Sequence, residues 1–293
     1  MKQSSFSRLA CVALLLSVAL PPLVAQEAQE PPEFNAADPE AQPWDKGSLK
    51  LGGLIASFSS DLTFGVSGAQ SGTINGEDLL GLDSTLTVFR ADALFRPGKS
   101  RRHQLDFTYA SYDRDGSATL SRELTIGDET FPVGAHVSSV LNFDLIRGTY
   151  SYALLQNNTA RIAVGLGVYA IPLEYGLQVQ TESGRSVVEG ADTTLPLPAL
   201  ALRAEVRLLP KLFLTADLDG LYLEISSFRG SLLDANLGLE YRVWKHLGFG
   251  LGYNFMGIHV DGEGSGSDYP GVNFVGSVDV QYSGLLLFGR ATF

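Results

Sequence analysis

Two short stretches contain the residue types of a hydrolytic site. "YDRDG" places Asp113 and Asp115 two residues apart, and "IHVDGE" does the same for His259 and Asp261. An acid pair across a rim from a His–Asp pair could activate a water molecule, because an oriented imidazole can accept its proton. Both stretches are also ordinary sequences for solvated loops, and short motifs of this kind occur without function. These four residues are the candidate catalytic set.

Other residues of reactive types lie in contexts that predict no chemistry. "HVSS" offers His136 and Ser139 without an acid to orient the imidazole. Gly248, Gly250 and Gly252 alternate with apolar residues, as in a strand, and do not open a helix that would cradle a phosphate. No cluster of His, Cys, Asp and Glu has the spacing of metal ligands. We therefore predict no metal, no cofactor and no enzymatic activity.

The elements that must position these residues are strands. In "SLLDANLGLEYRVWKHLGFGLGYNFMG" (231–257), apolar residues alternate with polar residues or glycine on both sides of a bend at Lys245-His246. Period-two alternation is typical of strands, because successive side chains leave opposite faces of the backbone. We expect ten strands, with eight as the alternative, and the ten segments are 48–58, 85–96, 102–113, 139–155, 160–179, 195–208, 211–224, 230–244, 246–259 and 277–293.

The N-terminal residues 1–25 have the features of a secretory signal peptide. Lys2 and Arg8 accompany the apolar run "LACVALLLSVAL", and "PPLVA" offers a cleavage point after Ala25. The run is too short for a transmembrane helix, which needs about 20 apolar residues. Cys11, the single cysteine, lies inside this signal, so we expect an exported chain without disulfides. Residues 26–46 are acidic, contain proline and lack periodicity, which predicts a disordered periplasmic lead.

Charge and connection lengths narrow the class of protein. The chain has 21 Lys+Arg against 32 Asp+Glu, a formal net charge of −11, which argues against nucleic acid as a partner. Tight polar turns centre on Pro97-Gly98, Asn157, Pro210 and Lys245. The alternate connections are mostly long and rich in Gly, Ser and Asp: 59–84, 114–138, 180–194, 225–229 and 260–276. Short turns at one end and long loops at the other are typical of a transmembrane β-barrel.

The C-terminus is also that of a barrel strand. The chain stops at "GLLLFGRATF", with Phe293 terminal and Leu285, Leu287 and Ala291 on the same face. In this feature residues 47–293 resemble the bacterial outer-membrane β-barrel proteins, and among these the small barrels of the OmpA-transmembrane and OmpW type. The resemblance implies a Gram-negative outer membrane, periplasmic N- and C-termini, and contact with outer-membrane lipid. It also implies that Phe293 is the assembly signal read by the barrel-assembly machinery, although Ala291 stands where a larger residue is common.

In a membrane barrel the apolar face of each strand meets lipid and the polar face meets the lumen. This orientation places six arginines and seven acids inside, a near balance that favours paired charges, since an unpaired buried charge is strongly destabilising. The predicted lumen charge network is Arg90, Asp92, Asp106, Arg147, Arg203, Glu205, Arg207, Asp217, Asp219, Asp234, Glu240, Arg242 and Arg290.

Barrel size then decides among the possible functions. Eight strands are just filled by side chains and open channels need about sixteen, so about ten strands predict a lumen filled with side chains. We expect an integral outer-membrane barrel with a structural or surface-binding role and an extracellular ligand that the sequence does not identify. The alternatives are a narrow porin-like channel, in which the arginines line an anion pathway, and a hydrolase acting at the extracellular rim. Pro172, Pro196 and Pro198 predict weak strand pairing near the outer ends of the fifth and sixth segments.

Overall fold

The computed structural model describes residues 43–64, 72–121, 123–126, 129–180, 186–225, 228–262 and 276–293, which all belong to one compact unit, Ala36–Phe293. The predicted signal peptide and most of the predicted lead lie outside the described residues. The elements are β1 (Gly47–Phe64), β2 (Gly72–Asn75), α2 (Gly76–Leu80), β3 (Thr85–Phe95), β4 (His103–Tyr112), β5 (Asp115–Thr119), β6 (Leu124–Ile126), β7 (Glu129–Phe131), β8 (His136–Gln156), β9 (Ala160–Gln180), β10 (Ser186–Leu209), β11 (Leu212–Ile225), β12 (Phe228–Arg242), β13 (Leu247–Gly262) and β14 (Gly276–Thr292).

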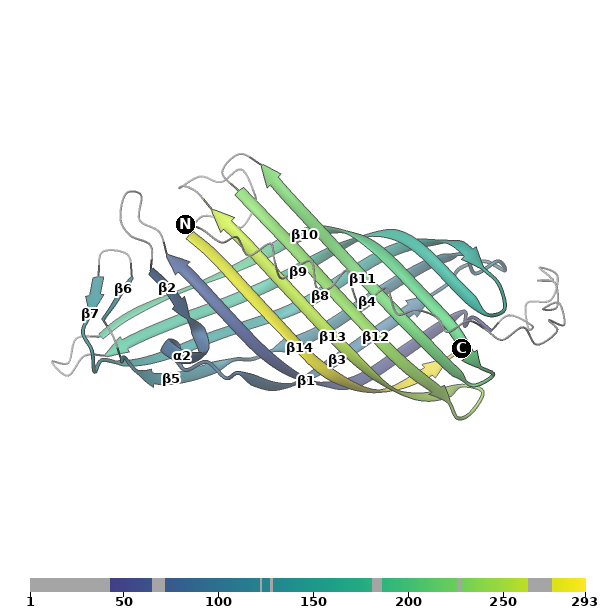
Figure 1. Cartoon of the computed structure of the whole chain (residues 1–293), viewed down its shortest axis with the longest axis horizontal. Coiled ribbons are helices and arrows are strands. Elements are labelled where there is room, and N and C mark those ends of the chain that lie inside the picture. The colour runs from purple at the N-terminus through teal and green to yellow at the C-terminus, as the bar shows by residue number, and fades with distance from the viewer. Residues whose placement is uncertain are drawn as a thin grey trace, which may run out of the picture. The chain divides into compact units, whose positions relative to one another are not determined.

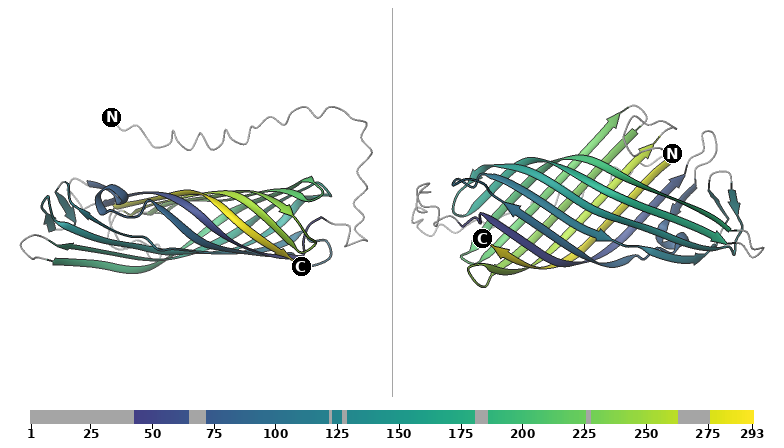
Figure 2. Two further views of the ribbon diagram at one scale, coloured as in Figure 1. Left: turned by 90° about the horizontal axis from the view of Figure 1, so that it is seen from below. Right: turned by 180° about the vertical axis from the view of Figure 1, so that it is seen from behind.

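Ten of these strands close into an antiparallel barrel. The order is β14-β13-β12-β11-β10-β9-β8-β4-β3-β1, and β1 pairs with β14 from Ser48↔Thr292 to Phe64↔Gly276. Closure satisfies the backbone groups that an open sheet would leave unpaired. Figure 1 shows β11–β14 running obliquely across the front of the barrel, and Figure 2 shows β8–β10 on the opposite side. The predicted fold and the count of ten strands are confirmed.

The two faces of the wall follow the alternation in the sequence. On β12, Leu237 and Leu239 are 52% and 44% exposed on the outer face, while Asp234 and Glu240 are buried inside. On β14, Leu287 is 60% exposed on the outer face and the next residue, Phe288, is buried inside. Side chains turned outward are therefore apolar along the span, which is the arrangement that lipid requires. None of the helices among the described residues is long and apolar enough to cross a membrane.

The two ends of the barrel differ, and we name them by their connections. The turn end carries the tight connections 96–102, 157–159, 210–211 and 243–246, together with Phe293. The loop end carries α2, β2, β5, β6 and β7, which gather at one end in Figure 1. Here the strands are longer than predicted: β8 has 21 residues, β9 has 21 and β10 has 24, although about 9–11 residues cross a membrane.

The short helix α2 was not predicted from the sequence. Its signals are local: the Asn75 side chain accepts from the Asp78 amide at 2.8 Å, and Gly81 closes the helix with φ of +68°. Five residues are too few to show a helical period. Gly116 packs directly against the end of this helix, because a Cβ at position 116 would lie 1.9 Å from the carbonyl oxygen of Gly81.

The pairing of β10 is asymmetric. Its Leu200–Leu209 half pairs with β11, whereas the half from Ser186 to Ala199 pairs only with β9. Pro196 and Pro198 both fall in the half that lacks a β11 partner. Proline cannot donate to a ladder and is found at sheet edges, so these residues fit the position they occupy.

Candidate functional site

The lumen is the candidate functional site, because the inward positions of ten strands gather most of the charged side chains there. From the turn end to the loop end, the inward side chains form three groups. We call these the charged layer (around Arg147 and Arg290), the apolar layer (around Phe58) and the cap (α2 with Arg114).

Two arginines share Asp219 at the centre of the charged layer, and one of them also binds Asp234. Arg147 donates to Asp219 at 2.8 Å and to Asp234 at 3.3 Å, and Arg203 donates to Asp219 at 2.9 Å. The Tyr169 hydroxyl donates to Asp234 at 3.0 Å. All five side chains are buried. Such charges are tolerated in a closed interior only when paired and hydrogen-bonded, and each of these is.

A second cluster joins the first through a hydroxyl group. Arg90 donates to Asp92 at 3.1 Å and to the amide oxygen of Asn254 at 3.4 Å. Thr108 donates from Oγ1 to Asp92 at 2.7 Å and accepts from Arg147 at 2.7 Å. The network therefore crosses the lumen, linking β3 and β4 with β8 and β13.

Towards the turn end, two glutamates each hold two arginines. Glu240 accepts from Arg290 at 2.7 Å and from Arg242 at 3.2 Å. Glu205 accepts from Arg96 and pairs with Arg161 at 3.5 Å. Arg96 and Arg161 are fully buried but were not predicted for the lumen, because they adjoin turns, where the alternation is lost. A sequence signal for them exists: Arg96 and Arg161 are separated by an even number of positions from Arg90 and Arg203, respectively, and alternate positions of a strand share a face.

The residues just before β1 lie across the mouth of the turn end. Trp44 is fully buried, its indole Nε1 donates to the Asn157 carbonyl at 2.9 Å, and its ring packs edge-to-face on Phe213. Asp45 accepts from Arg242 at 2.8 Å and from Arg290 at 3.1 Å. Residues 43–46, assigned from the sequence to a disordered lead, are thus bound to the barrel. Their binding depends on side chains from distant strands, which no local pattern reveals.

The loop-end half of the lumen is apolar, which the sequence analysis did not predict. Phe58, Tyr112, Phe143 and Tyr282 pack together, with ring centroids 4.5–6.4 Å apart, and the Tyr112 and Tyr282 hydroxyls are 2.6 Å apart. Aliphatic residues of β1 and of five further strands join them, including Leu54, Val88, Ile171, Leu197, Ala199, Leu232 and Met256. On these strands many of the outward residues are apolar as well, so the alternation of polar and apolar residues that marks the lumen elsewhere is lost here.

The cap closes this end. Arg114 is fully buried, donates to Glu77 of α2 at 2.5 Å and to Ser60 of β1 at 2.8 Å, and lies 4.5 Å from the centre of the Phe58 ring. It also donates to the Asp83 carbonyl at 3.1 Å. Leu79 and Leu80 of α2 belong to a second apolar cluster with Leu82, Leu120, Ala135, Val137, Leu141 and Val179.

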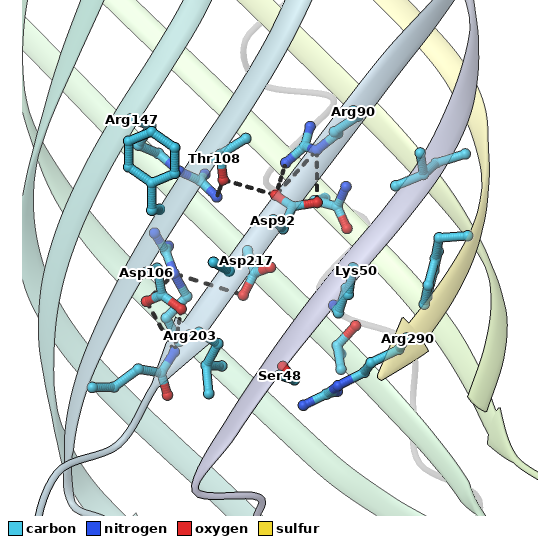
Figure 3. A pocket seen from close by; sticks show the side chains of 18 of the residues that line it. Ser48, Lys50, Arg90, Asp92, Asp106, Thr108, Arg147, Arg203, Asp217 and Arg290 are labelled. Carbon is cyan, nitrogen blue, oxygen red and sulfur yellow. Dashed lines mark hydrogen bonds and ion pairs between the residues drawn. The ribbon is translucent and has the colours of Figure 1, made fainter. Parts of the chain in front are cut away.

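A small polar cavity remains in the charged layer, and Figure 3 shows it with its lining side chains. Its volume is about 50 Å³, room for a few water molecules. Lys50, Arg90, Asp106, Asp217 and Arg290 are among its lining residues. Lys50 was not predicted for the lumen; its ammonium lies 5.1 Å from the centre of the Phe288 ring.

The three remaining residues of the predicted lumen network are Asp106, Asp217 and Arg207. Asp106 accepts from Gln104 at 2.8 Å and lies 3.8 Å from Arg203, and Asp217 lies 3.7 Å from Arg203. Arg207 is half-buried near the turn end and has no ion pair within the described part of the chain. The other ten predicted lumen residues take part in the ion pairs given above. Phe293 ends the chain with its side chain 69% exposed on the outer face.

The four candidate catalytic residues all face away from the lumen. Tyr112 and Arg114 are buried inside, so Asp113 and Asp115 project outward, and both are exposed. Val260 is buried inside, so His259 and Asp261 also lie on the outer face. Because β3, β1 and β14 separate the two pairs, they are roughly 20 Å apart along the wall at about 4.8 Å per strand. The structure therefore joins His259 to Asp261 but does not bring this pair to Asp113 and Asp115.

His259 has an unexpected second partner. Its Nε2 lies 2.9 Å from Asp261, and its Nδ1 lies 2.6 Å from Asp279 of β14. A span of about 9–11 residues from Leu247 ends before residue 259, so this group lies beyond the membrane. The hydrogen bond to Asp279, helped by that to Asp261, raises the pKa of His259 to about 9. A protonated imidazole with both nitrogens occupied cannot take a proton from water.

The described residues show no metal centre. No group of three or more His, Cys, Asp and Glu among them is arranged to hold a metal ion.

Comparisons with known proteins bear on the fold. No family model and no curated protein sequence matches the chain. The outer membrane protease OmpT from Escherichia coli is similar in structure, with a TM-score of 0.52 and 8% identity over 84% of this chain and 96% of OmpT. Neisserial surface protein A gives a TM-score of 0.32 at 10% identity, covering 85% of this chain and 97% of that protein. Ail of Yersinia pestis gives 0.33 at 8%, covering 85% and 99%. The similarity to OmpT and the closed antiparallel sheet show that the chain has the fold of outer-membrane β-barrel proteins.

Proposed function

We propose that this barrel is a non-conducting protein of a Gram-negative outer membrane that holds a binding surface outside the cell. In this proposal the turn end faces the periplasm and the loop end faces the exterior, as short turns and long loops are placed in bacterial barrels. The partners are outer-membrane lipid along the wall and the barrel-assembly machinery at Phe293.

The observation that carries the proposal is the filling of the lumen by two layers of different chemistry. The charged layer is cross-linked from wall to wall through Arg147 and Thr108. Above it, the described side chains of the apolar layer are aliphatic or aromatic, and the hydroxyls of Tyr112 and Tyr282 bond to each other, so the layer offers little to replace the hydration shell of a passing ion. A solute would therefore have to displace packed aromatic side chains before reaching the cap.

The binding surface is supported by the lengths of the strands. Since about 9–11 residues cross the membrane, roughly half of β8, β9 and β10 extends beyond it. The apolar cluster beneath α2 gives this extension a core of its own. A sheet with its own core holds a surface rigidly, and rigid elements carry binding sites more accurately than free loops.

We infer that the protein is not a hydrolase. Asp113 and Asp115 are too far along the wall from His259 to act on one water molecule. His259 is also held protonated by two carboxylates. OmpT is a protease, but an identity of 8% relates this chain to it in fold alone.

Planar-bilayer recording tests the proposal against the narrow-channel alternative. Purified, refolded protein is added at increasing concentration to a bilayer in 1 M KCl (an electrolyte of high conductance), with a wide porin as the positive control. We expect no steady conductance steps above the protein-free background. Reproducible steps that scale with protein concentration would favour the channel and end the proposal.

A further inference from the structure

Residues 43–45 occupy the turn-end mouth in the way a bound peptide occupies a site. The Trp44 ring is fully buried against Phe213 of β11, and its indole N–H donates to Asn157 in the β8–β9 turn. The contacts reach elements on the far side of the ring from β1, the strand that this segment leads into. The segment therefore crosses the opening and does not merely line its edge.

Cationic side chains hold the backbone and the carboxylate of the same segment. Arg242 donates to the Pro43 carbonyl at 3.0 Å and to the Asp45 carboxylate at 2.8 Å. Arg290 donates to that carboxylate at 3.1 Å, and Arg96 donates to the Asp45 carbonyl at 3.3 Å. Arg101 donates to the Trp44 carbonyl. These donors come from β12, β14 and the β3–β4 connection, so the mouth surrounds the segment.

We propose that residues 43–45 are a displaceable strap, an internal ligand of the turn-end mouth, whose withdrawal opens the polar cavity to solvent on that side. The strap and the cavity share Arg290, which binds Asp45 and lines the cavity. Glu205 and Ser48 also line the cavity. Removing the strap would take the Asp45 carboxylate from Arg242 and Arg290 at the entrance and leave Glu240 as the acid that they share.

The way the strap is held distinguishes it from the wall. At the turn end each barrel strand is bound to two neighbours by backbone ladders, whereas residues 43–45 precede the sheet and are held through side chains. Local opening requires the least free energy where the fewest cooperative bonds are broken. The strap is thus the part of the turn end that can open while the barrel stays closed.

The test measures access to the cavity in the full-length chain. Ser48 is a suitable reporter, because it is 2% exposed, lines the cavity, and its Oγ has no hydrogen-bond partner. Ser48→Cys is built with Cys11→Ala, which removes the only natural cysteine. The rate of reaction with a small, charged methanethiosulfonate reagent is measured in micelles, with heat-modifiable gel mobility as the check that each barrel is folded.

With the natural strap we expect slow modification, and we expect Trp44→Ala or Asp45→Ala to raise the rate by about tenfold or more, since each removes a principal contact. Trp244→Ala is the matched control: this tryptophan is at the same end, in the turn between β12 and β13, but is 63% exposed, and its loss should leave the rate unchanged. A synthetic peptide of residues 41–47, added in excess to the Trp44→Ala protein, should slow the reaction again.

Fast modification with the natural strap would overturn the proposal, because the mouth would already be open. Equal, slow rates in the folded Trp44→Ala and Asp45→Ala proteins would overturn it as well. If either variant fails to fold, Trp44→Phe and Asp45→Asn replace them, and unchanged rates in these folded variants count against the strap. Conductance of the unmodified barrel is a separate measurement, so failure of the strap and failure of the proposed function are distinguishable.

Discussion

Arg147 of β8 and Asp219 of β11 meet inside the barrel with their charged atoms 2.8 Å apart, although β9 and β10 lie between their strands in the sheet. Arg203 of β10 donates to the same carboxylate at 2.9 Å. One carboxylate thus pairs with two guanidinium groups that face the lumen. The stability of the barrel should depend on it more than on other acids of β11.

Asp219→Ala should therefore destabilise the barrel by about 3–5 kcal/mol, because it leaves two buried arginines short of a partner. The measurement is the urea midpoint of unfolding in detergent micelles, followed by tryptophan fluorescence. Asp217→Ala is the control on the same strand and the same face. Asp217 is 27% exposed in the lumen and 3.7 Å from Arg203, so its loss should have a clearly smaller effect. Equal losses would contradict the central role of Asp219.

The lipid-facing assignment is tested by adding a charge to the outer face. Leu237→Arg, near the middle of the span of β12, should cost about 2–4 kcal/mol, whereas Tyr241→Arg, close to the turn end, should cost about 0–1 kcal/mol. Reversible unfolding from lipid vesicles gives both values. A larger penalty at residue 241 than at residue 237 would mean that the span is misplaced.

The apolar layer should contribute to stability through packing. Phe58 is 6% exposed and contacts three other aromatic rings, so Phe58→Ala should cost about 3–5 kcal/mol. Phe89→Ala removes the same side chain from the outer face, where Phe89 is 56% exposed, and should cost less. The comparison uses urea midpoints as above. An unchanged urea midpoint in the Phe58→Ala variant would indicate that the apolar layer is loosely packed.

The cap should loosen without Arg114, which joins α2 to β1. In Arg114→Gln, the amides of residues 79–82 should exchange their hydrogens about tenfold faster or more, because a charged hydrogen bond to Glu77 and two contacts to the Asp83 carbonyl are lost. Hydrogen-exchange mass spectrometry measures this. Amides of β13, which lies away from α2, provide the internal control. Unchanged exchange at residues 79–82 would show that the apolar cluster alone holds α2.

The outer-rim histidine predicts a pH dependence of defined sign. The folded pKa of His259, about 9, lies above its unfolded value near 6.5, so folding favours the protonated form. The stabilisation is therefore complete below about pH 6.5 and is lost as the pH rises through about 9. Imidazole NMR signals should titrate near pH 9 in the natural protein and at lower pH in Asp279→Asn. A natural titration near pH 6.5 would contradict the double hydrogen bond.

Local sequence determined the strands and their outward faces, because alternation is a property of consecutive residues. Leu237 and Leu239 alternate with Asn236 and Glu240, and this pattern predicts both a strand and its lipid-facing side. The tight turns around Pro97-Gly98 and Pro210 were also predictable, since proline and glycine restrict or extend the backbone locally. From these features came the closed barrel of ten strands.

Tertiary structure alone decided which groups meet. Asp45 binds Arg242 and Arg290, which are 197 and 245 positions away in the sequence. Phe58 lies inside, between the outward-facing Ser57 and Ser59, because strand register and closure, not hydrophobicity, choose the face in the loop-end half of the wall. The rim pairs Asp113–Asp115 and His259–Asp261 looked alike in sequence. Closing the sheet turned both pairs outward and placed three strands between them.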